Sequence, residues 1–264
     1  MTRPLTHGFS GDWSGQLVAT SIHGGHGLRE DTAAAMRLDE DTRLREEDPF
    51  TDRIGSGAAA QVVVHHSRFE VDLNRLREEA VYRRPEDAWG LDIWTDGELD
   101  ATATENSLAQ YDRFYAELGE RLDELAARGP FVVYDVHSYN HRRDGEDDPG
   151  ADVADNPEVN LGTGTVDEHW RPVVEAFTRS LEAQEVAGHR LDVRENVKFE
   201  GRALAWFVHE RYPDTGLCLA LEFKKTFMDE WTGVPQDDHV AQLRDALAAT
   251  HEPVLDALRK VGPR

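Results

Sequence analysis

Four short runs of mainly apolar residues constrain this chain most strongly, because each one predicts a buried strand. They cover residues 16–22, 59–67, 131–138 and 217–223. Continuous apolar runs of this length are typical of strands that are covered on both faces. The sequence therefore favours a sheet that lies between helices.

Three segments with helical periodicity supply those helices. In residues 104–128, apolar side chains recur at steps of three and four residues until a Gly-Pro pair ends the pattern. Residues 169–185 and 239–261 show the same periodicity, and Pro253 is expected to kink or split the last helix. The alternation of strands and helices predicts an α/β sandwich around a mixed, largely parallel sheet.

Composition and charge narrow the range of partners. A formal net charge of −23 repels a nucleic-acid backbone and an anionic membrane surface. The chain has 264 residues without a repeat or a linker, so we expect a single domain over residues 1–264. Cys218 is the only cysteine, and its apolar setting predicts a packing role. The chain starts without the apolar core of a signal peptide and has no apolar run near ~18 residues, which predicts a cytoplasmic protein.

The third apolar run ends in polar residues that a buried strand does not need. Asp135 and His137 are two positions apart, so both side chains point to the same face of a strand, and Ser138 follows. His137 can act as a metal ligand with Asp135 orienting its ring. Alternatively, His137 is a histidine whose hydrogen bonds are satisfied at the end of a strand.

The first run also ends in histidines. His23 and His26 follow Ile22 with two glycines between them, which allow a sharp turn off the strand. His23 is the better candidate for a metal ligand. His26 is either a second ligand or an ordinary loop residue.

An acidic segment supplies candidates for a third ligand. Glu46, Glu47 and Asp48 precede Pro49, which is expected at the first position of a helix. A zinc site with two histidines needs one such carboxylate. The competing interpretation makes Asp48 the N-cap of that helix.

Two further segments place charged residues near strand ends. Arg68, Asn74 and Arg75 can clamp a substrate carboxylate, although surface ion pairing explains the arginines equally well. Glu222 ends the fourth apolar run, where a buried glutamate is costly unless it has a function or a partner. It can serve as a general base, or it can pair with Lys224.

Taken in order, these segments resemble the N-formylglutamate amidohydrolase family. The matching stretches span residues 22–230 and are IHGG, EEDPFTDRI, SRFEVDLNR, DVHS, NLGT, VRENVKFEGR and LALEFKKTFMDE. Two of them depart from the family pattern. Ile22 stands before His23 where the family usually has a proline, and a glycine-rich stretch appears here as KFEGR with Glu200 between Phe199 and Gly201. Residues 83–106 have no counterpart, and their tryptophans, Trp89 and Trp94, can line a different pocket.

The resemblance implies a three-layer α/β/α fold with one zinc ion per chain. The ligands it implies are His23, His137 and Asp48, with Glu46 in reserve. It makes Glu222 the general base. It also places Arg68, Asn74 and Arg75 on the substrate side, with Asp135 and Ser138 in support.

The activity implied by the resemblance is hydrolysis of the amide bond of a small N-acyl amino acid, either N-formylglutamate or a related N-acyl acidic amino acid. The alternatives are a zinc amidase or peptidase acting on peptides or peptidoglycan stems, and a non-catalytic binding protein that keeps the fold. The sequence does not define the oligomeric state.

Overall fold

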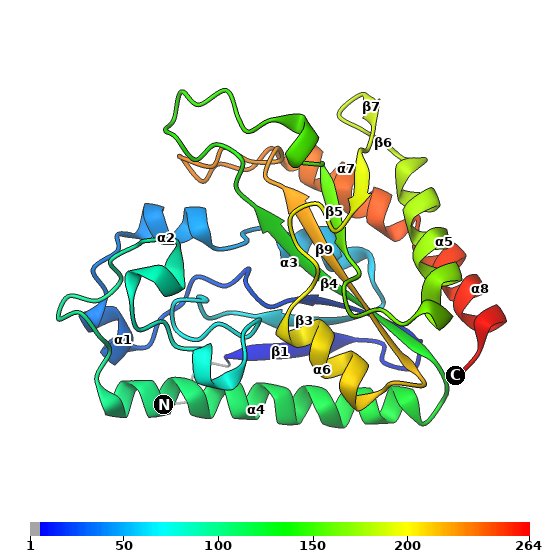
Figure 1. Cartoon of the computed structure of the whole chain (residues 1–264), viewed down its shortest axis with the longest axis horizontal. Helices are drawn as coiled ribbons and strands as arrows, with labels where there is room; N and C mark the ends of the chain where they lie inside the picture. Colours follow the sequence, from blue (N-terminus) through cyan, green and yellow to red (C-terminus); the bar gives the residue numbers. More distant parts are fainter. Residues whose placement is uncertain (1–5) are drawn as a thin grey trace.

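The computed structural model describes residues 6–264 and contains a seven-stranded mixed sheet (Figure 1). The strands follow the order β1-β3-β2-β4-β9-β5-β8. Among the strand pairs of this sheet within residues 6–264, β1·β3 and β5·β9 are antiparallel and the others are parallel. The bounds are β1 His7–Gly11, β2 Leu17–Ser21, β3 Ala60–Val64, β4 Phe131–Tyr139, β5 Val159–Gly162, β8 Val193–Glu195 and β9 Gly216–Lys224.

Helices cover both faces of the sheet, which confirms the three-layer α/β/α prediction. One core packs α4 (Ala101–Ala126) and α6 (Ala203–Arg211) against the sheet. The other packs α5 (Arg171–Glu182), α7 (Asp237–Ala248) and α8 (His251–Val261) on the opposite face. Strand β4 serves both cores, because alternate side chains point to opposite faces.

The remaining elements are short. They are α1 Glu30–Ala35, α2 Glu40–Glu46, α3 Thr51–Ile54, the hairpin β6 Glu185–Val186 with β7 His189–Arg190, and 3₁₀ turns at Gly55–Gly57, Arg77–Glu79, Pro85–Ala88, Val153–Asp155 and Glu168–Trp170. A smaller third core is formed by buried residues within 69–103, among them Tyr82 and Trp94. Among the helices in residues 6–264, none has the length and apolarity needed to cross a membrane.

The predicted strands and helices are confirmed, with one refinement at the C-terminal helix. It is split as expected, but the break comes at Ala249 and Thr250, ahead of Pro253. Pro253 lies in the first turn of α8, where a missing N–H costs no helical hydrogen bond. Cys218 is fully buried within a core, in agreement with its predicted packing role.

A half-buried histidine connects α6 to the centre of the sheet and makes stability dependent on pH. His209 Nε2 accepts a hydrogen bond from the backbone N–H of Cys218 at 2.9 Å. Burial lowers the pKa of His209 to about 4, below the value near 6.5 of an unfolded chain. The folded state therefore resists protonation, and stability is lost as the pH falls from about 6.5 towards 4.

We predict that His209→Gln reduces this loss, because glutamine keeps an acceptor but does not titrate. Between pH 7 and pH 5 the wild type should lose about 2 kcal/mol more unfolding free energy than the variant. Urea unfolding at each pH measures the difference. Parallel pH profiles for the two proteins would contradict the assignment.

Candidate active site

The carboxyl ends of three adjacent parallel strands, β2, β4 and β9, meet at one edge of the sheet. His23 follows β2 by two residues, and His137 lies near the end of β4. Glu222 lies near the end of β9, in register with His137. Open α/β sheets bind their ligands at this edge. The structure thus brings together candidates that are far apart in the sequence.

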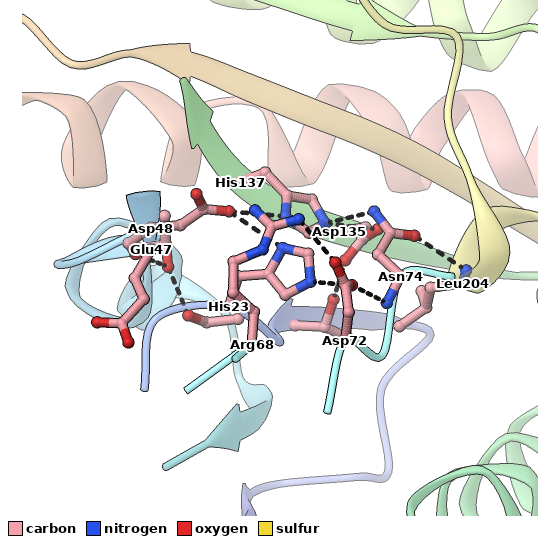
Figure 2. Close-up of polar contacts among 12 residues, drawn as sticks. His23, Glu47, Asp48, Arg68, Asp72, Asn74, Asp135, His137 and Leu204 are labelled. Atoms are coloured by element: carbon pink, nitrogen blue, oxygen red, sulfur yellow. Dashed lines mark hydrogen bonds and ion pairs between the residues drawn. The ribbon is translucent and has the colours of Figure 1, made fainter. Parts of the chain in front are cut away.

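Three buried side chains form a cluster that is suited to a metal ion (Figure 2). Oδ2 of Asp48 lies 2.9 Å from Nδ1 of His137 and 3.4 Å from Nδ1 of His23. The three ligand atoms lie within 4.8 Å of one another. Nδ1 of His23 is buried and has no hydrogen-bond partner within residues 6–264. Two imidazoles and one carboxylate with such an unsatisfied nitrogen fit a zinc-type site.

A carboxylate lies against the far nitrogen of each histidine ring. Nε2 of His23 is 2.7 Å from Oδ1 of Asp72, and Nε2 of His137 is 3.0 Å from Oδ2 of Asp135. Asp135 also accepts a hydrogen bond from Thr20 Oγ1 at 2.7 Å. These contacts favour a proton on Nε2, which leaves Nδ1 of each ring available as a ligand. Asp135 thus lies beside the His137 ring, and its role in orienting that ring stays a prediction.

The electrostatics of the cluster favour positive charge. Burial disfavours a charged imidazole, yet Asp135 and Asp48 raise the pKa of His137 well above its usual range. Burial likewise disfavours a carboxylate, yet His137 and His23 lower the pKa of Asp48. The carboxylates of Asp48 and Asp135 thus favour positive charge on the neighbouring imidazole, and they would favour a bound metal cation in the same way.

Asp72 connects this cluster to the substrate-side residues. Its Oδ2 accepts a hydrogen bond from Arg68 Nη2 at 2.8 Å and another from the Tyr82 hydroxyl, and lies 3.6 Å from Nε of Arg75. Although burial opposes it, Arg68 and His23 hold the pKa of Asp72 well below its usual range. This role of Asp72 was not predicted from the sequence. Its position between two arginines in SRFEVDLNR was the available signal.

Glu222 faces the same space without a protein partner. Within residues 6–264 its carboxylate makes no hydrogen bond or ion pair, and it is partly buried. Burial, with help from the nearby Asp48 carboxylate, raises the pKa of Glu222 to about 8 against the opposing effect of His137. The alternative pairing with Lys224 is wrong, because Lys224 Nζ donates instead to the Asn156 carbonyl at 2.9 Å.

The structure contradicts the interpretation of Asp48 as the N-cap of a helix that begins at Pro49. Helix α2 ends at Glu46, and α3 begins only at Thr51, after Phe50 in a left-handed conformation with φ of 67°. Pro49 is therefore not the first helical residue, and Asp48 is not an N-cap. The turn that separates the two helices leaves the Asp48 side chain free to reach the histidines.

The other acids of this segment have separate partners. Glu47 contacts His26 Nδ1 at 2.6 Å, and His26 is not part of the His/Asp/His cluster. Glu46, the reserve ligand, pairs with Arg143 at 3.2 Å and lines the cavity. Lys225 Nζ donates to the carbonyls of Arg45 and Glu47, both at 2.6 Å, and so braces the chain just before Asp48.

A cavity of about 510 Å³ opens at this edge of the sheet. Its wall includes the cluster, Glu222 and all three predicted substrate-side residues, Arg68, Asn74 and Arg75. Asn74 Nδ2 lies 3.3 Å from His137 Nε2, and its Oδ1 accepts from the Leu204 N–H at 3.3 Å. Ser138 also lines the cavity, and its Oγ has no hydrogen-bond partner within residues 6–264.

The prediction that the two tryptophans line a different pocket is wrong. Trp89 lines this same cavity, and the Arg68 guanidinium lies 4.8 Å from the centre of its ring. Trp94 is buried in the third core, where its Nε1 donates to the Tyr82 carbonyl at 2.8 Å. Several further residues line the cavity without having been predicted from the sequence, namely Tyr139, Asn140, Arg143, Lys198, Phe199, Arg202, Trp206 and Lys225.

The fold is an α/β sandwich with a cavity at the carboxyl edge of its parallel strands. The model of the N-formylglutamate amidohydrolase family matches residues 15–228. The chain belongs to this family, which indicates an enzyme that hydrolyses amide bonds. No curated protein matches the chain.

Two solved structures share the fold at low sequence identity. The crystal structure of N-formylglutamate amidohydrolase from Ralstonia eutropha JMP134 is 17% identical, with a TM-score of 0.72, covering 96% of this chain and 98% of that one. A gene product of Agrobacterium tumefaciens is also 17% identical, with a TM-score of 0.66, covering 97% of this chain and 96% of that one. At this identity the likeness shows the fold alone.

We predict that Asp72→Asn weakens metal binding by roughly 10- to 100-fold, because the amide no longer holds the His23 ring as a carboxylate does. Competition with a chromogenic chelator measures the affinity. Asp112→Asn is the matched control, since Asp112 also pairs with an arginine but lies on the surface. Equal affinities in D72N and D112N would contradict the role of Asp72.

Proposed function

We propose that this chain is a zinc-dependent amidohydrolase that cleaves the amide bond of a small N-acyl amino acid, with N-formylglutamate as the first candidate. The observation that carries the proposal is the position of Glu222, which is paired in register with His137 on the adjacent strand and lines the same cavity as the buried His/Asp/His cluster. Family membership supports the amide as the bond that is cleaved. The cavity volume, about 510 Å³, suits a small molecule.

In this proposal His23, Asp48 and His137 hold one zinc ion per chain. Two imidazole nitrogens and a carboxylate oxygen leave a coordination position open, as catalytic zinc sites require. When bound, the ion supplies Lewis acidity, which polarises the substrate carbonyl and makes water more acidic. Asp72 and Asp135 keep the two rings in the orientation that binding needs.

Glu222 is the general base of the proposed reaction. It has no protein partner to release, and a pKa raised to about 8 by burial suits proton exchange near neutral pH. Glu222 takes the proton of the attacking water and then delivers it to the leaving nitrogen. This transfer converts a poor leaving group, the amide anion, into a neutral amine.

Arg68 and Arg75 provide the positive charge that the substrate needs. Asp72 neutralises only one of the two guanidiniums, so the pair keeps a net positive charge within the cavity. Arg68 stabilises the oxyanion that develops on the carbonyl. Arg75 holds the α-carboxylate of the amino acid, so that the amide is correctly placed for attack.

Glu222→Gln should retain the metal and lose turnover by about 10²- to 10⁴-fold, because glutamine fills the same space but cannot accept a proton. Formate release from N-formyl-L-glutamate measures turnover, and elemental analysis measures the metal. Glu120→Gln, an exposed position on α4, is the control. Normal turnover in E222Q would remove Glu222 from the mechanism. A zinc-loaded wild type that hydrolyses no N-acyl amino acid would contradict the proposed function.

His137→Ala should abolish stoichiometric metal binding, because it removes one of the three proposed ligands. Elemental analysis of protein purified without a histidine tag should find about one zinc per wild-type chain and little in the variant. His189→Ala, which removes an exposed histidine, is expected to keep the wild-type content. Retention of one tightly bound zinc in H137A would refute the ligand assignment.

A further inference from the structure

A loop at residues 198–202 forms one wall of the cavity, and β5 holds its shape. The fully buried Asn160 accepts hydrogen bonds from the backbone N–H of Lys198 at 2.8 Å and of Phe199 at 3.4 Å, and donates to the Phe199 carbonyl at 2.8 Å. A Cβ added to Gly162 would lie 2.6 Å from the backbone nitrogen of Gly201. The loop is thus fixed against the sheet before any ligand binds.

One cation of the cavity wall is left without a protein acceptor. The cationic side chains of the lining are Arg68, Arg75, Arg143, Lys198, Arg202 and Lys225. The acceptors in the protein are Asp72 for Arg68 and Arg75, Glu46 for Arg143, Asn156 for Lys198, and backbone carbonyls for Lys225. Within residues 6–264 the guanidinium of Arg202 makes neither an ion pair nor a hydrogen bond, and Arg202 is exposed. Its donors are available to a ligand.

Arg202 and the His/Asp/His cluster line the same cavity. The Arg202 carbonyl accepts a hydrogen bond from Trp206 N–H at 2.9 Å, so Arg202 immediately precedes α6. The next turn of chain is tied to the cluster, because Asn74 contacts both the Leu204 N–H and His137. The N-terminus of α6 adds partial positive charge at the same place.

Glu200, the acidic residue of the loop, does not pair with the guanidinium of Arg202. Glu200 is two residues before Arg202, yet no ion pair joins them. The Glu200 carboxylate lies instead against Gly164, where its Oε2 is 3.1 Å from the position that a Cβ would take. The backbone carbonyl of Glu200 accepts from the Gly164 N–H at 2.8 Å and fixes this arrangement.

We propose that Arg202 binds the side-chain carboxylate of the substrate and thereby selects acidic over neutral N-acyl amino acids. This inference rests on the proposed function and assigns the second anionic group of the substrate to a specific residue. A planar guanidinium matches a carboxylate with two parallel hydrogen bonds, which a neutral amide cannot match in charge.

Arg202→Met tests the inference with two substrates of nearly equal shape, N-formyl-L-glutamate and N-formyl-L-glutamine. We expect kcat/KM for the glutamate substrate to fall roughly 10- to 100-fold, chiefly through KM, while kcat/KM for the glutamine substrate stays within about twofold. Arg190→Met is the matched control, because Arg190 is exposed outside the cavity and the change in net charge is the same. Equal losses for both substrates, or no loss for either, would overturn the assignment.

A binding measurement separates failure of this inference from failure of the proposed function. Calorimetry with L-glutamate and L-glutamine on zinc-loaded protein should show weaker glutamate binding in R202M than in R190M. If the wild type hydrolyses neither substrate but this difference is found, Arg202 is an anion site and the proposed reaction is wrong. If glutamate binds R202M and R190M equally, the role of Arg202 is refuted whatever the activity.

Discussion

The buried carboxylate of Asp72 joins the two halves of the site, and the arrangement of the other residues depends on it. One oxygen contacts His23 and the other contacts Arg68, so the same group orients a proposed metal ligand and a proposed substrate arginine. A buried carboxylate is stable only when cationic and hydrogen-bonding partners surround it. The partners of Asp72 are the same residues that the proposed chemistry requires.

Charge is segregated within the cavity in a way that suits the proposed reaction. Carboxylates surround the two histidines at the end of β2 and β4, which favours a cation there. Arginines stand on the substrate side and at the start of α6, which favours an anionic substrate. Glu222 lies between these regions on β9, where burial rather than an ion pair sets its pKa. The parallel strands create this layout because their carboxyl ends meet at one edge.

The central strands and the long helices were predictable because continuous apolar runs and helical periodicity are local signals. The strands β1, β5 and β8 were not predicted, because they are short and their pairing depends on the strands beside them in the sheet. Asp48 could be recognised as a ligand candidate, but an acid before a proline also predicts a helix cap, and only the left-handed Phe50 resolves the turn. Asp72 and Arg202 were missed because their roles depend on tertiary contacts.

Anomalous diffraction at the zinc absorption edge, from crystals of untagged protein grown with zinc, tests the central claim most directly. We expect one strong peak per chain, bounded by Nδ1 of His23, Nδ1 of His137 and the Asp48 carboxylate, with Glu222 beside it on β9. Density at any other position, or no anomalous peak at the cluster, would contradict it. Such a result would leave the fold intact and remove the basis for the proposed hydrolysis.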